Sequence, residues 1–127
     1  MPAHSANLRD NPHREHRMIT QQMAEDAVDW LRDNARVMAQ ARAERLYLEQ
    51  YIKTTKATIM VEHQGSSVAA AETAALASPR YMSVLQAYKA AIEQDEYYRF
   101  MAAAAEAKIE AWRSQESTRR AESKATA

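Results

Sequence analysis

Residues 64–79, QGSSVAAAETAALASP, interrupt a sequence that otherwise favours continuous helix. Between Thr20 and Glu122 the chain has one glycine, Gly65, and one proline, Pro79, and both belong to this stretch. The residues on either side are mainly alanine, glutamate, arginine, glutamine and methionine, which are good helix formers. The pattern predicts an all-α protein in which two long helices fold back on each other, as an antiparallel hairpin, around one short break.

Residues that favour helix ends place the boundaries of these helices. Thr20 is a suitable N-cap for the first helix, and Gly65 is a suitable stop. Ser66 and Ser67 precede an alanine-rich run, and Ser78-Pro79 joins an N-cap to a proline in the first helical position. We therefore expect a flexible arm over residues 1–18, a hairpin domain over 19–118 (helices at about 20–63, 67–76 and 79–117) and a flexible tail over 119–127.

Residues spaced three and four apart predict the seam between the long helices. The predicted stripe of the first helix is Val28, Leu31, Ala35, Met38, Ala41, Arg45, Leu48, Ile52, Thr55 and Ile59. That of the second is Tyr81, Val84, Leu85, Tyr88, Ile92, Asp95, Tyr98, Ala102, Ala105, Ile109 and Trp112. Large apolar side chains are sparse in both, so two helices alone bury little. We expect a homodimer that forms a four-helix bundle; a domain-swapped dimer fits the same pattern.

A turn centred near residue 71 brings together residues whose numbers add to about 142. This register predicts that Arg45 pairs with Asp95 inside the seam and that Trp30 lies beside Trp112. A charged pair in a seam adds little stability, but it fixes the register because a slip by one turn separates both charges from their partners.

The composition argues against several classes of protein. Lys plus Arg and Asp plus Glu each number 17, so no net charge draws the chain to nucleic acid or to a membrane surface. There is no cysteine, and no apolar stretch approaches the roughly 20 residues of a membrane span. We expect a soluble protein in the cytoplasm.

No residue pattern predicts an enzyme, a cofactor or a metal site. His13 and His16 are three apart, but they follow Pro12 in the predicted arm, where a solvated segment is the simpler interpretation. Adjacent carboxylates such as Asp95 and Glu96 point apart on a helix, and one glycine cannot build a phosphate-binding loop.

The six tyrosines, with nearby Arg and Lys side chains, have two interpretations. Stacking tyrosines and phosphate-binding cations would suit single-stranded nucleic acid. The simpler interpretation is that they border the seam, apolar below and hydrated above. The candidate nucleic-acid-binding residues are Lys53, Lys56, Arg42 and Arg113; the candidate structural residues are Arg45, Asp95, Trp30 and Trp112.

Three segments carry a resemblance to a known group of proteins. They are Tyr51-Ile-Lys-Thr-Thr-Lys-Ala, Ser78-Pro-Arg-Tyr-Met, and Glu106-Ala-Lys-Ile-Glu-Ala-Trp-Arg-Ser-Gln-Glu-Ser. Over roughly residues 45–118 the chain resembles small uncharacterised helical phage and prophage proteins encoded near recombination and replication genes, beside single-strand annealing proteins. The resemblance implies a role in assisting DNA recombination or replication within the bacterial host.

Two functions from different classes follow. The first is a non-enzymatic accessory of phage DNA recombination or replication that binds a phage recombination protein or single-stranded DNA. The second is a protein–protein interaction module, an adaptor or host-directed inhibitor, without nucleic-acid binding. Basic residues gathered on one face would favour DNA, whereas basic residues that each face an acidic neighbour would favour the module. A third interpretation is a small secreted helical hairpin, of the type that carries a Trp-x-Gly turn between its two helices. It is poorly supported, because the only glycine, Gly65, follows Gln64 and does not belong to such a turn.

Overall fold

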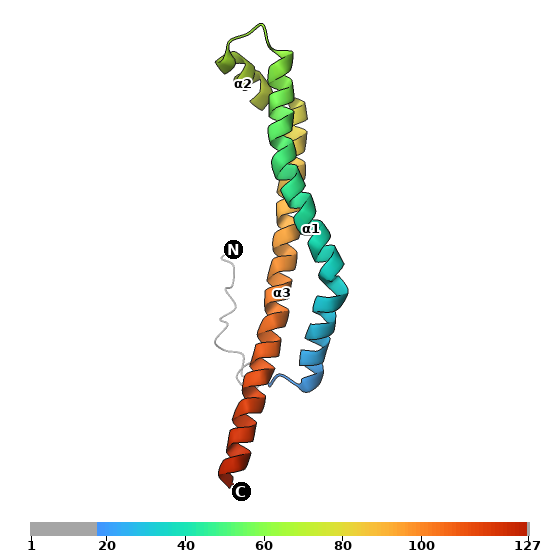
Figure 1. The fold of residues 1–127 in the computed structure, drawn as a ribbon, viewed down its shortest axis with the longest axis vertical. Helices are drawn as coiled ribbons and strands as arrows, with labels where there is room; N and C mark the ends of the chain where they lie inside the picture. Colours follow the sequence, from blue (N-terminus) through green and yellow to red (C-terminus); the bar gives the residue numbers. More distant parts are fainter. Residues whose placement is uncertain (1–17, 127) are drawn as a thin grey trace, which may run out of the picture.

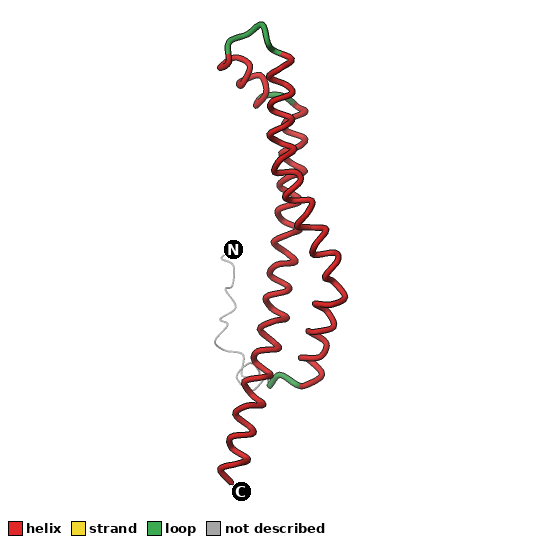
Figure 2. Tube along the Cα trace, viewed as in Figure 1, coloured by secondary structure: helices red, strands yellow, loops and turns green. Residues whose placement is uncertain are grey.

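The structure, a computed structural model, describes residues 18–126, and these residues form three helices. Helix α1 spans Gln21–Glu62, α2 spans Val68–Leu76 and α3 spans Pro79–Thr126. The two long helices, α1 and α3, lie antiparallel, and α2 lies at the end where they are connected (Figure 1). Over the described residues the chain is all helix and connecting loop (Figure 2), which confirms the predicted hairpin. The arm predicted for residues 1–18 lies outside the described residues except for Met18.

The N-caps predicted from the sequence are present at all three helices. In each case the cap hydroxyl accepts a hydrogen bond from a backbone N–H of the first turn: Met23 donates to Thr20, Ala70 to Ser67 and Arg80 to Ser78. Pro79 is the first residue of α3, where its missing N–H costs no hydrogen bond. Local capping therefore sets where each helix begins.

The predicted end of α1 at about residue 63 agrees with the structure to within one residue, but the prediction that Gly65 caps this end is wrong. The helix ends at Glu62, and its C-cap is His63, whose backbone N–H donates to the Met60 carbonyl at 3.0 Å. Gly65 does not have a positive φ. The turn therefore uses backbone angles that other residues also adopt, and the end of α1 does not depend on the conformational freedom of glycine.

The seam between α1 and α3 follows an unbroken heptad pattern in both helices. The α1 residues that face α3 are Ala24, Ala27, Leu31, Asn34, Met38, Ala41, Arg45, Leu48, Ile52, Thr55 and Ile59, all buried or half-buried. Their α3 counterparts are Tyr81, Val84, Tyr88, Ala91, Asp95, Tyr98, Ala102, Ala105, Ile109, Trp112 and Glu116. Steps that alternate between three and four residues are the spacing of a left-handed coiled coil.

Two predicted seam positions of α1 are wrong, although most of the predicted stripe is correct. Val28 is 48% exposed and Ala35 is also exposed, because the heptad passes through Ala27 and Asn34 instead. The Asn34 side-chain amide donates to the Trp30 carbonyl at 2.9 Å, so its polar group is satisfied at the seam. Leu85 of α3 is likewise 39% exposed.

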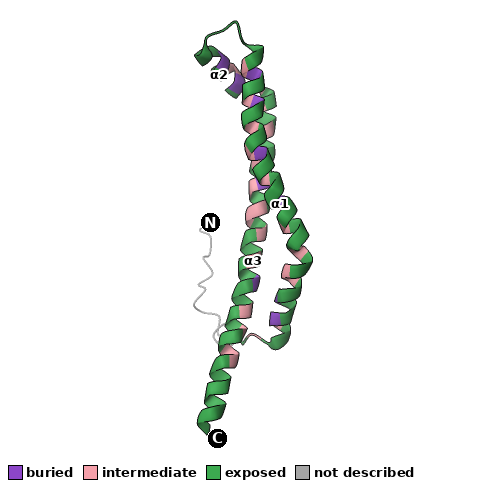
Figure 3. Cartoon of the chain, viewed as in Figure 1, coloured by how far each residue is buried: buried purple, intermediate pink, exposed green. Residues whose placement is uncertain are grey.

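The buried core is small and consists mostly of alanine. Nine apolar residues of the described chain are buried, and only Leu48 and Ile59 among them are larger than alanine. Figure 3 shows these buried positions as short purple segments between long exposed surfaces. Two alanines of the core, Ala71 and Ala75, come from α2 and cover the turn-side end of α1.

The register between the long helices changes along the hairpin. The numbers of paired residues add to 142 for Glu62 and Arg80 at the turn, to 140 for Arg45 and Asp95, and to 134 for Ile19 and Gln115 at the open end. Helix α1 bends around the straighter α3 (Figure 1), so it uses more residues to cover the same length. A constant sum of 142 therefore fails at the open end.

The C-terminal part of α3 is longer than predicted, since the helix continues to Thr126. The sequence predicts a helix end near residue 117 and a tail over 119–127. Arg119 pairs with Glu116 at 3.3 Å, and Lys124 lies in the last turn, where a cation is favourable. These local interactions extend the helix although the seam pattern has ended.

Candidate functional site

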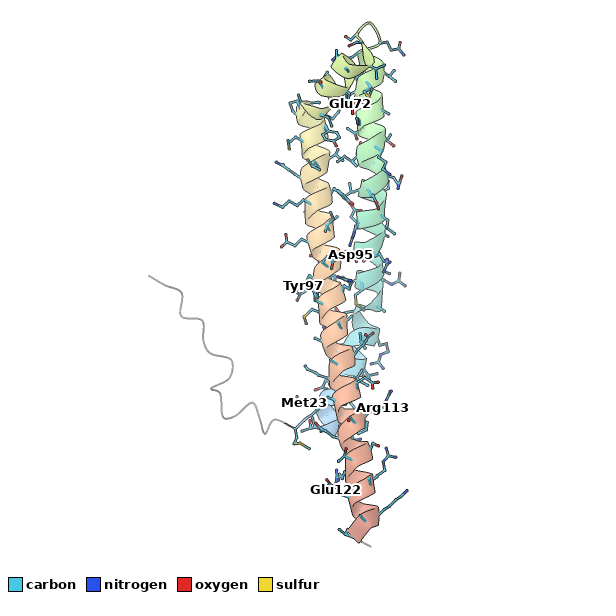
Figure 4. The ribbon with its side chains drawn as sticks, turned by 90° about the vertical axis from the view of Figure 1, so that its left-hand side faces the viewer. Met23, Glu72, Asp95, Tyr97, Arg113 and Glu122 are labelled. Carbon is cyan, nitrogen blue, oxygen red and sulfur yellow. The ribbon has the colours of Figure 1, made fainter. Side chains whose placement is uncertain are left out.

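Arg45 is the centre of a charged cluster in the middle of the hairpin. Its Nη1 donates to Asp95 Oδ2 at 3.1 Å and to Glu96 Oε1 at 3.0 Å, so one guanidinium of α1 bridges two carboxylates of α3. Arg99 also contacts Glu96, at 2.8 Å. In Figure 4 the Asp95 side chain points from α3 toward α1. The pair predicted between Arg45 and Asp95 lies where the expected register places it, and Glu96 and Arg99 extend it into a network.

These contacts alter the ionisation of the groups. The hydrogen bonds that Arg45 donates to Glu96 and, second, to Asp95 raise the pKa of Arg45 above its ordinary value. Partial burial opposes ionisation of Glu96, but hydrogen bonds from Arg45 and Arg99 outweigh that effect and lower the pKa of Glu96. Both shifts favour the charged forms of Arg45 and Glu96 at neutral pH.

A groove opens beside this network, with a volume of about 510 Å³. We call it the arginine groove and define it by Arg42, Arg45, Leu46, Glu49, Glu96 and Arg99, all of which line it. Leu46 is 51% exposed within it. Over the described residues no ion pair involves Arg42. The groove thus combines an exposed apolar side chain with a cation whose charge is not already matched.

A second set of ion pairs holds the connection in place. Lys56 of α1 contacts Glu72 of α2 at 2.8 Å, and Arg80 contacts Glu62 across the turn at 2.7 Å. The hydrogen bond between Lys56 and Glu72 raises the pKa of the lysine and lowers the pKa of the glutamate. These charges join α2 and α3 to the end of α1.

The four candidate nucleic-acid-binding residues are dispersed along the hairpin. Lys56 is paired with Glu72, and Arg113 is paired with Glu110 at 2.8 Å. Arg42 lies in the arginine groove, and Lys53 is exposed eleven positions further along α1 toward the turn. Arg113 lies near the opposite end of the hairpin, since it lines a groove with Val28 and other residues at the start of α1. The structure does not bring the four together.

The two tryptophans do not lie side by side, so this part of the prediction is wrong. Trp30 lines a groove with Met101, Ala104, Ala105 and Lys108. Trp112 lines different grooves, near Gln21 and Ala24 on one side and Met18 and Ile19 on another. The changed register at the open end separates them. Between the Arg45–Asp95 pair and the Ile19–Gln115 contact, α1 and the residues before it use several more residues than α3 to cover the same length.

The tyrosines border the seam as the simpler interpretation predicts. The exposed rings of Tyr47 and Tyr51 stack on each other, with centroids 5.7 Å apart and planes 9° from parallel. Tyr97 is 54% exposed, whereas its neighbour Tyr98 faces the seam. Lys53 and Arg42 lie on another side of α1 from the stacked pair, because residues two or five positions apart on a helix do not share a face. The rings and cations do not alternate on one surface.

Several contacting residues were missed by the sequence analysis. Gln115 binds the backbone of Ile19 twice: its Oε1 accepts from the Ile19 N–H at 3.0 Å, and its Nε2 donates to the Ile19 carbonyl at 2.8 Å. No local pattern marks a glutamine for this role. Met101, which lines a groove with Trp30 and Lys108, could have been found from its spacing of seven residues from Lys108.

No protein-family model, curated protein or solved structure matches this chain. Over residues 18–126, no helix is long and apolar enough to cross a membrane. Within the same residues, no three His, Asp or Glu side chains are grouped as metal ligands would be.

Proposed function

We propose that the protein is a non-enzymatic interaction protein that acts as a homodimer and binds a partner protein through the arginine groove. The observation that carries this proposal is that half of the fourteen basic residues in the described chain pair with acidic neighbours, at positions from Arg32 to Arg119. Seven arginine and lysine side chains in the described residues have a carboxylate within 4.0 Å: Arg32, Arg45, Lys56, Arg80, Arg99, Arg113 and Arg119.

This pairing favours a protein partner over single-stranded DNA. Phosphate binding depends on cations that are free to neutralise the backbone and release its counterions. Lys56 and Arg113 already contact carboxylates, and a DNA backbone would have to displace them. A surface with alternating charges and exposed apolar side chains suits a protein partner, because charge complementarity selects the partner while apolar burial supplies affinity.

The arginine groove supports docking by a partner with an acidic side chain next to an apolar one. Arg42 offers a guanidinium that can take a carboxylate in a two-pronged hydrogen bond, and arginine is among the residue types enriched at interfaces. Leu46 lies one helical turn further along the same helix and offers apolar surface. The Arg45 network keeps α1 and α3 in the register that forms the groove.

The resemblance to phage proteins supports the biological setting of the proposal. It suggests that the partner is a recombination protein of the same phage, such as a single-strand annealing protein, met in the cytoplasm of the bacterial host. The protein would then act as an accessory that organises this partner.

Isothermal titration with the purified single-strand annealing protein of the same phage tests the proposal. We expect Arg42→Glu to weaken binding at least about tenfold, because it reverses the charge of the one cation lining the groove that is unpaired within the described residues. Lys53→Glu makes the same change on the same helix outside the groove, and should leave the affinity unchanged.

Fluorescence anisotropy with single-stranded DNA at about 50 and 200 mM salt tests the alternative function, which is direct binding of DNA. Salt-sensitive binding by the wild type that is lost in Lys53→Glu would replace the partner-protein proposal with the DNA-binding one. Absence of binding to both the annealing protein and DNA would refute the recombination setting.

A further inference from the structure

The two flanks of the seam differ in character. One flank carries the arginine groove and the Arg45 network, and it also has exposed apolar residues such as Leu46 and Leu85. The other, which we call the apolar flank, is formed by Met23, Trp30, Val37 and Tyr51 of α1 and by Tyr97 and Met101 of α3. The four α1 residues share one heptad position, since they are seven or fourteen residues apart, and Met23, Trp30 and Met101 line one groove. Figure 4 shows Met23 and Tyr97 on one side of α3 and Arg113 on the other.

Most side chains of the apolar flank are exposed in the single chain. The exposed fraction is 43% for Tyr51, 54% for Tyr97, 40% for Val37 and 38% for Met101. The buried core, by contrast, holds only two apolar residues larger than alanine. Four large side chains of this flank therefore lie at the surface, where a second hairpin could bury them, while Trp30 and Met23 are half-buried.

Bulky and small residues alternate between the two helices of this flank. Trp30 of α1 lies against Ala104 and Ala105 of α3, which form the floor of a groove of about 280 Å³. By the register of the Arg45–Asp95 pair, Tyr51 lies level with residues 87–90 of α3, which include Ala87 and Ala90. Where α3 carries its large side chain, Tyr97, the α1 residues at that level are Ala43 and Glu44.

This alternation selects the orientation of a second copy. A two-fold axis parallel to the hairpin places α1 of one copy on α3 of the other at the same level, so that Trp30, Tyr51 and Tyr97 meet alanines and Val37 meets Met101. An axis across the middle of the flank would place α1 on α1, with Val37 on Val37 and Tyr51 on Met23. Close packing therefore favours the parallel axis, in which Tyr51 packs on alanines and not on Met23.

The area of the flank is sufficient for such a dimer. Met23 and Tyr51 are 28 positions apart, which is about 42 Å along a helix. At a width of about 20 Å for two helices, the strip covers about 800 Å², which is what each partner contributes to a standard stable interface.

We propose that a second copy of this chain docks on the apolar flank with its two-fold axis along the hairpin, so that Trp30 of each copy enters the alanine-floored groove of the other. Tyr51 of each copy packs on Ala87 and Ala90 of its neighbour, and both turns lie at the same end of the bundle. This inference rests on the homodimer in the proposed function and names its interface. It leaves the arginine groove open on the outer side of each hairpin for a partner protein.

Filling the groove with a side chain of the same copy tests the interface. Ala104 is exposed, so Ala104→Trp is compatible with the hairpin but occupies the space for the neighbour's Trp30. We expect sedimentation equilibrium to show a dimer for the wild type and a dissociation constant raised about thirtyfold or more for Ala104→Trp. Ala103→Trp introduces the same side chain one position away, on the opposite flank, and should remain dimeric with the wild-type constant.

Cysteine cross-linking tests the orientation without disturbing the core, because the chain has no cysteine of its own. After equal amounts of Tyr51→Cys and Ala90→Cys are mixed and oxidised, we expect a cross-linked dimer. Neither variant alone should cross-link. A disulfide requires Cα atoms within about 7 Å, so the result reports direct proximity.

The outcomes separate this inference from the proposed function. A wild-type dimer that gives no link in the mixture, or that links through Tyr51→Cys alone, overturns this interface but keeps the homodimer. A wild-type monomer at all concentrations overturns both the interface and the homodimer. Partner binding that is lost in Arg42→Glu while the dimer persists bears only on the arginine groove.

Discussion

Arg45 and Asp95, fifty residues apart in the sequence, meet across the seam with 3.1 Å between Nη1 and Oδ2. Their side chains are only 33% and 17% exposed, and the seam around them is otherwise apolar or small. A slip of α3 by one heptad would place Tyr88 or Ala102 opposite the guanidinium. The pair therefore discriminates between registers that the alanine-rich seam alone would hardly distinguish.

We expect Asp95→Ala to destabilise the protein by about 1 kcal/mol, because Arg45 keeps Glu96 as a partner but loses its more buried one. For a chain of this size the thermal midpoint should fall by roughly 3–6 °C. Melts followed by circular dichroism measure this shift.

The exposed pair of Arg113 and Glu110 gives the control for that experiment. Glu110→Ala breaks an ion pair between side chains that are about two-thirds exposed, and should change the midpoint by less than 1 °C. An unchanged midpoint in Asp95→Ala would show that the seam pair has no structural role.

Gly65→Ala should leave the protein equally stable or stabilise it by about 0.4–1 kcal/mol. Gly65 does not have a positive φ, and a Cβ built on it meets no atom within 4 Å. Alanine would therefore reduce the conformational freedom of the unfolded chain without strain in the folded one. Urea unfolding measures the change.

Ser67→Ala, two positions away, provides the contrast to Gly65→Ala. It removes the cap that accepts the Ala70 N–H at 3.2 Å and should cost about 1 kcal/mol. A loss of stability in Gly65→Ala as large as this one would mean that the turn does need glycine.

The helices, their caps and the middle of the seam could be predicted from sequence because each depends on nearby residues. Thr20, Ser67 and Ser78 lie directly before the helices they cap, and Arg45 and Asp95 lie close enough to the turn for a constant register to hold. The contacts of Trp30 and Trp112 could not be predicted, because small differences in helix path accumulate with distance from the turn.

The surfaces proposed for binding could not be predicted from the sequence either. Whether a lysine such as Lys56 is free or paired depends on a residue of another helix, here Glu72, and no local pattern contains that information. The asymmetry between the two flanks becomes visible only once the seam is fixed, because a shift of the heptad from Ala27 to Val28 exchanges seam and flank positions.

Stability should fall in acid through Glu96 and Glu72. Both have pKa values lowered in the folded state, from 4.5, by hydrogen bonds from basic partners. Their stabilising contribution is therefore present above pH 4.5 and is lost as the pH falls below that value through the folded pKa. Lys56, whose pKa is raised from 10.5, contributes below pH 10.5 and loses its contribution only in stronger alkali.

Urea midpoints measured from pH 7 to pH 3 test this dependence. Glu96→Gln should flatten the acid limb, since glutamine keeps the shape but does not titrate. Glu110→Gln, whose pair is more exposed, should leave the curve close to that of the wild type. Equal acid limbs in wild type and Glu96→Gln would exclude this carboxylate as a source of the pH dependence.

Truncation after Thr118 should remove helix without weakening the hairpin. Residues 119–126 are helical but exposed, and they extend beyond Gln115, whose contact with Ile19 joins the start of α1 to α3. We expect the far-ultraviolet signal to decrease in proportion to the residues lost, while the unfolding midpoint stays within about 1 °C. A large fall in the midpoint would indicate that this segment has a partner, and a second copy would be the first candidate.

Gln115→Ala should loosen the beginning of α1 and little else. Gln115 makes two hydrogen bonds to the backbone of Ile19, at 3.0 and 2.8 Å, and each such bond contributes about 0.5–1.5 kcal/mol. Because these bonds lie at the open end, far from the Arg45 network, their loss should act locally. Amide exchange of Ile19 should accelerate markedly, while that of Leu48 in the seam stays constant.

Gln115→Glu separates the two bonds, since a carboxylate still accepts from the Ile19 N–H but cannot donate to its carbonyl. This variant should give an intermediate exchange rate at Ile19. If Gln115→Ala accelerates exchange equally at Ile19 and Leu48, the two ends of the hairpin unfold together and the contact is part of the global stability.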